Sequence, residues 1–437
     1  MSINTIAIRK ENIDETEKRS PLSPHQVHKL IHVHSTNVLI EPWPNRYFSD
    51  AKYRQSGAKI SDDLDKANVI FGVKEVPIDD LLPEKTYAFF SHTIKGQSHN
   101  MPLLQAILDK KITLMDYEKV TDKNGRRLIF FGPYAGLAGA INAIWLLGER
   151  LKGQGIKNPF SAIKQAKTYI DLADAKKALQ KAGESIQKNG LPDTGKPWVF
   201  VITGNGTVSK GAQEIIDILP VREISPTYFL ELQRFQKFDL NTLYKVVIDC
   251  DNFVKPRDPK DYFDWQEYFN YPEKYTADFV KYLPDITLLI NGIFWNTMYP
   301  KLVTKNDLEE LYSREENPNL KIIADITCDL EGSIECNLKT TTSDNPVYVY
   351  NPFKRTITDG TAGTGPVILA VDKLPSELPA ESTEFFGGSL IPFVPSLAKV
   401  DFSKNLDNLE VPAEFKRAII THQGKLTPDF EYLKEFL

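Results

Sequence analysis

The stretch WVFVITGNGTVSKGAQEIIDIL, Trp198 to Leu219, decides the fold of this chain. An apolar run leads into a glycine turn, which is followed by a segment in which Ile215, Ile216 and Leu219 recur at helical spacing. A strand, a glycine turn and a helix in this order are typical of a dinucleotide-binding fold. The sequence therefore predicts dinucleotide binding at this turn, and the alternative is a tight strand-to-helix turn without a ligand.

The glycines of this turn have a physical role. Gly204 and Gly206 let the backbone turn tightly and approach a pyrophosphate, whose charge the helix N-terminus stabilises. Ser209 stands where a third glycine would complete the pattern, and serine is small enough for a helix to pack closely on a strand. The residues predicted to contact the coenzyme here are Gly204, Asn205, Gly206, Thr207 and Val208.

The choice of coenzyme depends on a segment further along. A dinucleotide fold usually carries an acid for the adenosine ribose about 20 residues beyond the glycines. Here that segment reads VREISP, Val221 to Pro226, and Ser225 with Arg222 or Lys210 nearby would accept a 2′-phosphate. Glu223 argues the other way, because a small register shift would restore an acid typical of NAD(H) sites. The sequence favours NADP(H), with NAD(H) as the alternative.

Length and composition restrict the class of protein. The 437 residues suggest two or three domains at roughly 150 residues each. With 41% hydrophobic and 25% charged residues the chain is ordinary globular protein, not a disordered one. The net charge of -5 argues against nucleic acid as the main partner and favours small molecules. The three cysteines, Cys250, Cys328 and Cys336, have no spacing typical of a disulfide framework or a zinc site.

One uncharged stretch, Leu128 to Gly148, is long enough to suggest a membrane span. Pro133 divides it, so we expect a short strand, Leu128 to Phe131, and a helix of small residues, Tyr134 to Leu151, packed inside the protein. The N-terminal sequence lacks an apolar segment, so it resembles neither a secretory signal nor a transit peptide. We therefore expect a cytoplasmic protein without a membrane partner.

Short β-rich runs alternate with helical ones, which is the pattern of an α/β protein. After Asn345 the density of prolines predicts short helices that wrap across another domain, and the last 20 residues predict a surface helix or tail. The expected strands are Thr5–Ile8, Asn37–Ile40, Val69–Val73, Thr86–Phe90, Ile112–Met115, Trp198–Ile202, Val246–Asp249, Thr287–Ile290 and Lys321–Asp325, and helices are expected after Pro24 and from Asn100 to Lys110.

Ionisable residues follow three of the expected strands. Lys74 and Glu75 follow VIFGV, His92 follows TYAFF, and Glu118 follows ITLMDY. Open α/β sheets place their ligands at the carboxyl ends of strands, so these groups predict one shared cleft. The alternative is a set of unrelated surface charges at the starts of loops.

The histidines His25, His28, His32 and His34 crowd one segment, and the first three share a helical face. A metal site is one interpretation. The segment lacks cysteine and opens an amphipathic helix, so we favour a solvated helix face and predict no metal site.

Eight segments in order along the chain form one recognisable set. They are KRSPLSP (Lys18–Pro24), GVKEVP (Gly72–Pro77), TYAFFSHTIKGQ (Thr86–Gln97), DYEKVTDKNGRR (Asp116–Arg127), FGPYAGLAGAIN (Phe131–Asn142), TGNGTVSKGAQ (Thr203–Gln213), LINGIFW (Leu289–Trp295) and ADITCDLEGSIE (Ala324–Glu335). With these segments the chain resembles the alanine dehydrogenase superfamily, and within it most closely the lysine-ketoglutarate reductase half of animal and plant aminoadipic semialdehyde synthases. Fungal lysine-forming saccharopine dehydrogenases are also similar, but match less well around TGNGTVSKGA and SHTIK.

The resemblance implies that the ε-amine of L-lysine condenses with 2-oxoglutarate and that NADPH reduces the imine to saccharopine, the first step of lysine degradation. Lys74 and His92 match the family's acid/base pair. For Lys95 and Asp325 a structural ion pair is an equally good interpretation. The predicted substrate-binding residues are Arg19, Glu75, Lys95, Glu118 and Arg127, and the predicted coenzyme residues beyond the glycine turn are Ser225, Asn291, Gly292 and Asp325.

The resemblance also implies an architecture of two Rossmann-like domains. A discontinuous catalytic domain, residues 1–139 and 346–437, would accompany a dinucleotide-binding domain, residues 140–345. Animal relatives are mitochondrial and continue into saccharopine dehydrogenase, so a linked saccharopine dehydrogenase is one possible partner. A second copy of the chain, in a homo-oligomer, is the other. The rival functions are NAD-dependent, lysine-forming saccharopine dehydrogenase, an amino-acid dehydrogenase of the alanine type, and a noncatalytic nucleotide-binding module.

Overall fold

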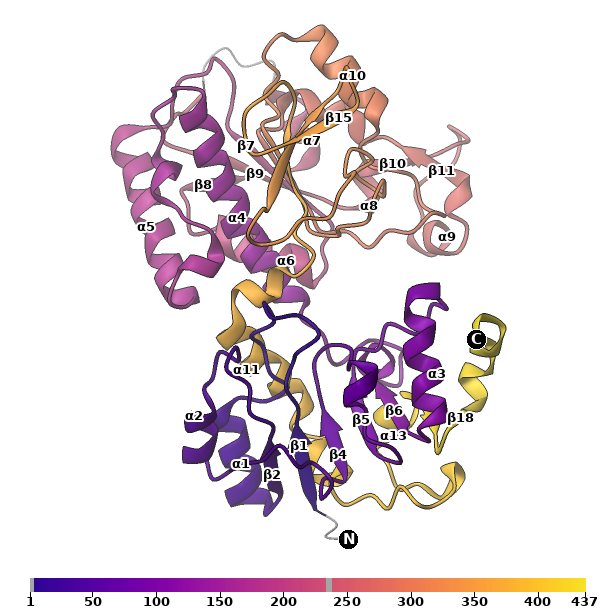
Figure 1. Ribbon diagram of the computed structural model, residues 1–437. Helices are drawn as coiled ribbons and strands as arrows, with labels where there is room; N and C mark the ends of the chain where they lie inside the picture. Colours follow the sequence, from indigo (N-terminus) through magenta and orange to yellow (C-terminus); the bar gives the residue numbers. More distant parts are fainter. Residues whose placement is uncertain (1–3, 233–237) are drawn as a thin grey trace. The chain divides into compact units, whose positions relative to one another are not determined.

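The computed structural model describes residues 4–232 and 238–437 (Figure 1). The chain divides into two compact units, Met1–Phe131 with Pro379–Leu437, and Gly132–Leu378. Each unit is built on one eight-stranded sheet in which parallel pairs predominate, which confirms the expected α/β class. The first unit is discontinuous in sequence, as the resemblance implied.

The sheet of the first unit has the strand order β18-β17-β6-β5-β4-β1-β2-β3. The six strands in the order β6-β5-β4-β1-β2-β3 pair in parallel. Strand β17 joins β6 in antiparallel orientation. The strands are β1 (Thr5–Ile8), β2 (Asn37–Ile40), β3 (Lys59–Ile60), β4 (Val69–Phe71), β5 (Thr86–Phe89), β6 (Thr113–Asp116), β17 (Ile419–His422) and β18 (Lys425–Leu426), and the helices are α1 (Pro24–His34), α2 (Asp50–Gln55), α3 (Met101–Asp109), α11 (Pro379–Leu390), α12 (Val394–Leu397) and α13 (Ala413–Lys416).

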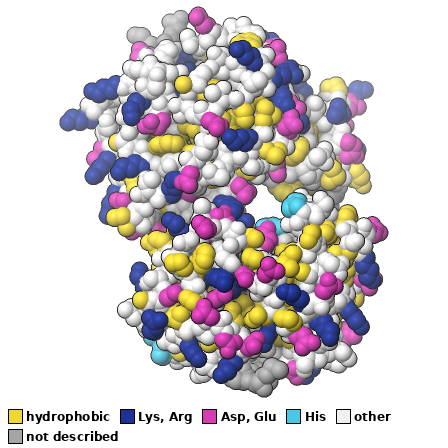
Figure 2. Space-filling view, in the orientation of Figure 1, with side chains coloured by type: hydrophobic (Ala, Val, Ile, Leu, Met, Phe, Trp, Pro, Cys, Tyr) yellow, Lys and Arg dark blue, Asp and Glu magenta, His cyan; other side chains and the backbone are white. Residues whose placement is uncertain are grey.

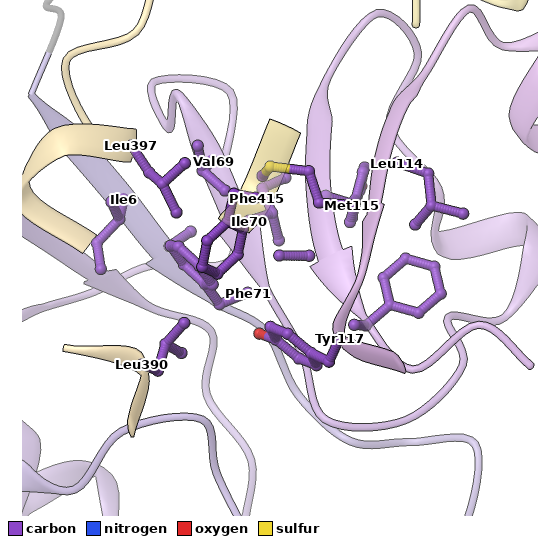
Figure 3. Packing of buried hydrophobic residues seen from close by; sticks show 14 of the residues in the cluster. Ile6, Val69, Ile70, Phe71, Leu114, Met115, Tyr117, Leu390, Leu397 and Phe415 are labelled. Atoms are coloured by element: carbon purple, nitrogen blue, oxygen red, sulfur yellow. The ribbon is translucent and has the colours of Figure 1, made fainter. Parts of the chain in front are cut away.

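The core of the first unit joins the two ends of the chain. Strand residues such as Ile6 and Phe71 pack in one cluster with Leu390, Leu397 and Phe415 from the C-terminal segment, and all five are fully buried (Figure 3). The removal of this apolar surface from water is the main favourable term for the docking of the C-terminal segment. The expected helix after Pro24 is confirmed, and a capping box formed by Ser23 and Gln26 begins it.

The sheet of the second unit has the strand order β15-β14-β16-β13-β12-β7-β9-β8. The six strands in the order β16-β13-β12-β7-β9-β8 pair in parallel. Strands β14 and β15 extend the sheet beyond β16 as an antiparallel edge. Its strands are β7 (Val199–Thr203), β8 (Val221–Glu223), β9 (Leu243–Ile248), β12 (Leu288–Asn291), β13 (Ile322–Asp325), β14 (Val347–Asn351), β15 (Thr356–Asp359) and β16 (Val367–Leu369), with a separate ribbon of β10 (Val254–Pro256) and β11 (Tyr275–Ala277). Its helices are α4 (Gly132–Gly153), α5 (Leu172–Asn189), α6 (Thr207–Ile216), α7 (Pro226–Phe229), α8 (Cys250–Phe253), α9 (Trp265–Asn270) and α10 (Lys305–Arg314).

Helix α4 packs against α6 at unusually short range, and glycines make this possible. A Cβ on Gly136 would come within 1.9 Å of the backbone oxygen of Val208, and a Cβ on Gly211 within 2.2 Å of the backbone oxygen of Pro133. Both helices therefore present bare backbone at their crossing. This confirms the expectation of a packed helix of small residues, and in the described part of the chain no helix is long and apolar enough to cross a membrane.

Two expectations about elements were wrong, and a third was right only in part. Residues 128–131 form no strand, since they lead directly into α4, and the Phe131 ring stacks on Phe386 with the ring centroids 4.6 Å apart. Residues 346–378, expected in the catalytic domain, contribute β14, β15 and β16 to the second sheet, because β16 pairs in parallel with β13. The last 20 residues were expected to form a surface helix or tail. They begin with the buried strand β17 and end in a helix, Pro428–Phe436, that is exposed apart from Phe430 and Leu433, so only the second part of this segment is the expected surface helix.

The boundaries between the units accordingly differ from those expected. Helix α4 begins at Gly132, and its contacts place it wholly in the second unit, so residues 132–139 do not belong with the first sheet. On the face drawn in Figure 2, basic and acidic side chains are interspersed, which fits the small net charge of -5.

We expect Gly136→Ala to destabilise the protein. Alanine is a better helix former than glycine by about 1 kcal/mol, but the new methyl group would collide with backbone, and overpacking costs roughly 1–3 kcal/mol or more. The measurement is the free energy of unfolding in urea. Gly153→Ala on the same helix is the matched control, because no described atom lies within 4 Å of its Cβ position. Equal stability of the two variants would contradict the close crossing.

Candidate functional site

The first unit brings the ionisable residues predicted at strand ends to one edge of its sheet. Strands β4, β5 and β6 are neighbours, and Phe71, Ala88 and Met115 are partners in the parallel register. The loops that follow the three strands therefore begin at the same level. They carry Lys74 and Glu75, His92, and Glu118 respectively.

His92 and Glu75 form the central pair of this edge. The His92 Nδ1 is hydrogen-bonded to the Glu75 Oε1, and both side chains are about one-quarter to one-third exposed, at 34% and 24%. The His92 backbone has a φ of 53°, a region that residues other than glycine adopt rarely, and Asn100 Nδ2 holds its carbonyl oxygen at 2.9 Å. The surrounding chain therefore holds His92 in a backbone conformation that costs conformational free energy, with its ring bonded to Glu75.

The pair shifts the protonation of both groups. The hydrogen bond from Glu75 raises the pKa of His92 above its ordinary value, although partial burial works in the opposite direction. Burial would raise the pKa of Glu75, but the hydrogen bond to His92 lowers it overall. His92 therefore keeps its proton to higher pH than a free histidine, beside an ionised carboxylate.

Glu11 positions the loop that carries Lys74. It is buried, and its two carboxylate oxygens accept hydrogen bonds from the backbone N–H groups of Val73, at 2.7 Å, and Lys74, at 2.9 Å. Burial raises the pKa of Glu11. Within residues 4–232 and 238–437, no hydrogen bond or ion pair engages the Lys74 ammonium, so it remains available to a ligand.

Asp116 connects the loop that carries His92 with the loop that carries Glu118. It is buried at the end of β6, and its Oδ2 accepts hydrogen bonds from both the backbone N–H and the hydroxyl of Ser91, the residue before His92. Its Oδ1 accepts one from the backbone N–H of Glu118 at 2.7 Å. One carboxylate therefore sets the positions of His92 and Glu118 together, and burial raises its pKa.

Arg19 is bound inside the first unit rather than projecting freely. Its Nε and one terminal nitrogen donate to the two carboxylate oxygens of buried Glu17, at 2.8 and 2.6 Å. The guanidinium also lies 4.2 Å from the centre of the Phe131 ring. Burial would raise the pKa of Glu17, but the pair with Arg19 lowers it overall. The remaining N–H groups of Arg19 keep open the predicted contact with a substrate carboxylate.

The other predicted substrate residues differ in their surroundings. Arg127 is exposed, and its guanidinium lies 5.7 Å from the centre of the Phe90 ring, which stacks on His92 with the ring centroids 6.2 Å apart. Phe90 thus connects Arg127 to the acid/base pair. Lys95 is exposed in the loop after His92, and Glu118 is half-buried.

The glycine turn of the second unit leaves the N-terminus of α6 open. Gly204 has a φ of 79°, and its N–H donates to the carbonyl oxygen of Ile248 at 2.9 Å. Gly206 is the N-cap of α6, and no described atom lies within 4 Å of its Cβ position, so the approach to the helix N-terminus is open. Ser209 is fully buried at the third position, as its small size predicted. Residues 204–208 therefore fit the phosphates of a dinucleotide.

Three polar residues end neighbouring strands beside this turn. Thr203, Asn291 and Asp325 are partners in the parallel register of β7, β12 and β13. The Thr203 hydroxyl donates to Asn291 Oδ1 at 2.7 Å, and Asn291 Nδ2 donates to Asp325 Oδ1 at 2.9 Å. Burial raises the pKa of Asp325, which also accepts bonds from Thr327 and Asn337. The predicted coenzyme residues Asn291 and Asp325 are thus parts of one buried row.

Gly292 and Ser225 complete the predicted coenzyme set. Gly292 directly follows Asn291 and packs on α6, since its Cβ position lies 3.1 Å from Val208 Cγ1. Ser225 is exposed at the N-terminus of α7, where its hydroxyl accepts a hydrogen bond from the backbone N–H of Tyr228 at 3.1 Å. Ser225 therefore follows β8, at the outer edge of the sheet.

The buried carboxylates that support the site were not predicted from the sequence. Glu11 and Asp116 lie at or just after the ends of β1 and β6, which is the same positional signal that identified His92. Glu17 precedes Arg19 by only two residues. The buried Tyr117 hydroxyl, which has no hydrogen-bond partner among the described residues, carries no such signal.

Comparisons with known proteins identify the family of the chain. Residues 7–138 match the N-terminal domain of alanine dehydrogenase/PNT, and residues 260–429 match its C-terminal domain. The chain is 37% identical to an alpha-aminoadipic semialdehyde synthase of Arabidopsis thaliana, over 98% of this chain and 41% of that protein. With the mitochondrial alpha-aminoadipic semialdehyde synthase of Bos taurus the identity is 36%, over 98% of this chain and 47% of that protein. The chain therefore spans less than half the length of these relatives.

A shorter relative and two solved structures match over most of their lengths. A saccharopine dehydrogenase (NAD(+), L-lysine-forming) of Emericella nidulans is 28% identical, over 90% of this chain and 92% of that protein. An L-alanine dehydrogenase structure has a TM-score of 0.63 at 18% identity, covering 99% of this chain and all of that one. The transhydrogenase from Sinorhizobium meliloti has a TM-score of 0.51 at 14% identity, covering 98% of this chain and 100% of that one. At these identities the two structures indicate the fold alone.

We expect the imidazole of His92 to titrate above pH 6.5, its ordinary pKa, and Glu75→Gln to lower that pKa. Because the pKa of His92 is raised in the folded state, its protonation stabilises the folded protein at pH values below the ordinary histidine pKa. This contribution is lost as the pH rises through the raised pKa. The measurement is an NMR titration of the His92 ring, assigned with His92→Gln. Glu84→Gln, which removes an exposed carboxylate of the same unit, is the control. An unchanged His92 titration in Glu75→Gln would contradict the pair.

Proposed function

Because the chain belongs to the alanine dehydrogenase/PNT family, we propose that it joins L-lysine and 2-oxoglutarate by reductive condensation to saccharopine. One relative is named a lysine-forming saccharopine dehydrogenase and two others are named alpha-aminoadipic semialdehyde synthases. These relatives support an oxidoreductase of lysine and saccharopine metabolism. The observation that carries the proposal is the free Lys74 ammonium beside the hydrogen-bonded pair of Glu75 and His92.

The condensation needs two proton-transfer groups. The ε-amine of lysine must lose a proton before it attacks the ketone carbon, and the hydroxyl of the resulting carbinolamine must gain a proton to leave as water. His92 suits the second role, because the hydrogen bond from Glu75 raises its pKa and so favours the protonated imidazolium. Lys74 Nζ suits the first role, the removal of a proton from the ε-amine. Glu11 positions the loop that carries it, through hydrogen bonds from the backbone N–H groups of Val73 and Lys74.

The substrates bear charges that the site complements. Saccharopine and 2-oxoglutarate carry carboxylates, and the planar guanidinium group of Arg127 can grip two oxygens. Arg19, which already binds Glu17 through two nitrogens, would contribute its remaining N–H groups. Lys95 adds an exposed cation in the loop after His92. Glu118, half-buried and positioned by Asp116, suits an amino-acid ammonium group.

The second unit supplies the coenzyme site in this proposal. A reduced nicotinamide coenzyme provides the hydride that converts the imine into a secondary amine. Residues Gly204 to Val208 would hold its pyrophosphate, and the row of Thr203, Asn291 and Asp325 would border it. The condensation itself is the same whether the hydride comes from NADPH, which the sequence favours, or from NADH.

The test is coenzyme oxidation with L-lysine and 2-oxoglutarate together and with each omitted in turn, and mass spectrometry identifies the product. Saccharopine formation that requires both substrates is expected. Coenzyme oxidation with pyruvate and ammonia but none with lysine would instead establish an alanine-type dehydrogenase. A clear preference for NADH and for saccharopine cleavage would favour the lysine-forming saccharopine dehydrogenase.

We expect Lys74→Met to lower kcat by roughly 10²- to 10⁴-fold, the usual contribution of one acid/base group. Coenzyme affinity should stay the same, because the glycine turn belongs to the other unit. Lys29→Met on the exposed face of α1 is the matched control and should keep full activity. Full turnover by Lys74→Met would remove the proposed chemistry.

We expect Arg127→Ala to raise the KM for 2-oxoglutarate about 10- to 100-fold, since a hydrogen bond to a charged group contributes roughly 1.5–3 kcal/mol. Its neighbour offers a control: Arg126 is exposed and bound to Asp122 at 2.9 Å, and Arg126→Ala should leave the KM unchanged. Equal KM values in the two variants would exclude Arg127 as a carboxylate ligand.

A further inference from the structure

The chain makes a tight turn directly after His92. The N–H of Gly96 donates to the carbonyl oxygen of Thr93 at 3.0 Å, which closes a turn of four residues. Ile94 and Lys95 are its two central residues. Thr93, at the inner end of the turn, is fully buried, whereas Lys95 is exposed. In the part of the chain that the structure describes, no hydrogen bond or ion pair engages the Lys95 ammonium.

The central peptide of such a turn has two alternative orientations. Turns of type I and type II differ by a rotation of this peptide, and type II requires a positive φ at the third residue. The φ of Lys95 is negative, which excludes type II here. The orientation of the peptide between Ile94 and Lys95 sets the direction in which the lysine side chain leaves the backbone. A contact that fixes the Ile94 carbonyl therefore also orients Lys95.

The opposite end of the chain supplies that contact. The Tyr432 hydroxyl donates a hydrogen bond to the Ile94 carbonyl oxygen at 2.6 Å, across 338 residues of sequence. The Phe436 ring covers Gly96, since a Cβ on this glycine would come within 2.6 Å of the ring. Gly96 also has a φ of 64°, so glycine suits the position for both reasons. Two side chains of the C-terminal helix, Pro428–Phe436, thus contact the turn that carries Lys95.

The C-terminal helix is anchored independently of this turn. It has the 3₁₀ form, in which residues three apart share a face, so Phe430, Leu433 and Phe436 lie in one row. Phe430 and Leu433 are buried in the core of the first unit, whereas Phe436 is 47% exposed and lies on Gly96. Just before the helix, the Thr427 hydroxyl donates to a carbonyl oxygen of β17 at 2.6 Å. The core and the sheet therefore fix the support on which the turn rests.

We propose that Tyr432 and Phe436 are positioning residues, which fix the turn after His92 and so orient Lys95 toward a substrate carboxylate. The inference rests on the proposed function, in which Lys95 is a cation for the carboxylates of 2-oxoglutarate. Lysine carries a compact charge on a flexible four-carbon stem, so the place of the charge depends on how its backbone is held. Neither aromatic residue contacts the substrate in this role, because each acts through the turn.

The test is the affinity for 2-oxoglutarate, measured by calorimetry on the full-length protein saturated with NADPH or NADH and without lysine. Tyr432→Phe removes only the hydroxyl, and we expect it to weaken binding about 3- to 10-fold, the range for one hydrogen bond. Phe436→Ala should weaken binding by a similar factor. The matched controls, Tyr262→Phe and Leu437→Ala, remove an exposed hydroxyl and an exposed apolar side chain, and both should bind as the wild-type protein does.

A second measurement distinguishes positioning from a general effect on the fold. In a protein that carries Lys95→Met, the addition of Tyr432→Phe should cause no further loss of affinity, because the turn then has no cation to orient. Hydrogen exchange of the Gly96 N–H should be faster in Tyr432→Phe and in Phe436→Ala than in the wild-type protein. Circular dichroism spectra check that all variants are folded.

Two outcomes would overturn the inference. One is wild-type affinity in both Tyr432→Phe and Phe436→Ala, and the other is an equal loss from Tyr432→Phe with and without Lys95→Met. The titration contains no lysine, so it is separate from the test of the proposed reaction. Binding of 2-oxoglutarate that depends on Tyr432, without saccharopine formation, would contradict the reaction alone. Saccharopine formation by a protein whose affinity does not depend on Tyr432 would contradict the positioning alone.

Discussion

Two buried carboxylates, Glu11 and Asp116, hold the arrangement on which the candidate chemistry depends. Each accepts backbone hydrogen bonds from loops that leave the carboxyl ends of the strands, and those loops carry Lys74, His92 and Glu118. Burying a carboxylate costs free energy unless its oxygens accept hydrogen bonds. A movement of these loops would break such bonds, so the buried carboxylates hold the loops in place. The reactive side chains are thus held by a support that they do not themselves form.

The second unit uses the same principle for a different purpose. Asp325 is buried and bonded through Asn291 to Thr203, so the ends of β7, β12 and β13 are joined in one row beside the glycine turn. Glycine at the crossing of α4 and α6 brings the helix that begins at this turn close to its neighbour. The glycine turn is therefore stabilised from two sides, by polar bonds at the strand ends and by direct contact of helix backbones.

Much of both units could be predicted because the deciding signals are local. Apolar runs identified the buried parallel strands, and polar residues directly after them identified Lys74, Glu75, His92 and Glu118. The failures have a common cause. Residues 128–131 are as apolar as a strand, but Phe131 packs on Phe386 and Arg19 instead. Strand β17 looks like a tail until it pairs with β6, about 300 residues earlier in the chain.

The sequence by itself determined the α/β class, the glycine turn and the kinds of ionisable groups that follow the strands, because each depends on neighbours a few residues apart. Only the tertiary structure decided which of those groups are tied to buried partners, as Arg19 is to Glu17. It also decided that β9, and not β8, lies beside β7. Strand order depends on hydrogen bonds between distant segments, and no local pattern specifies which segments those are.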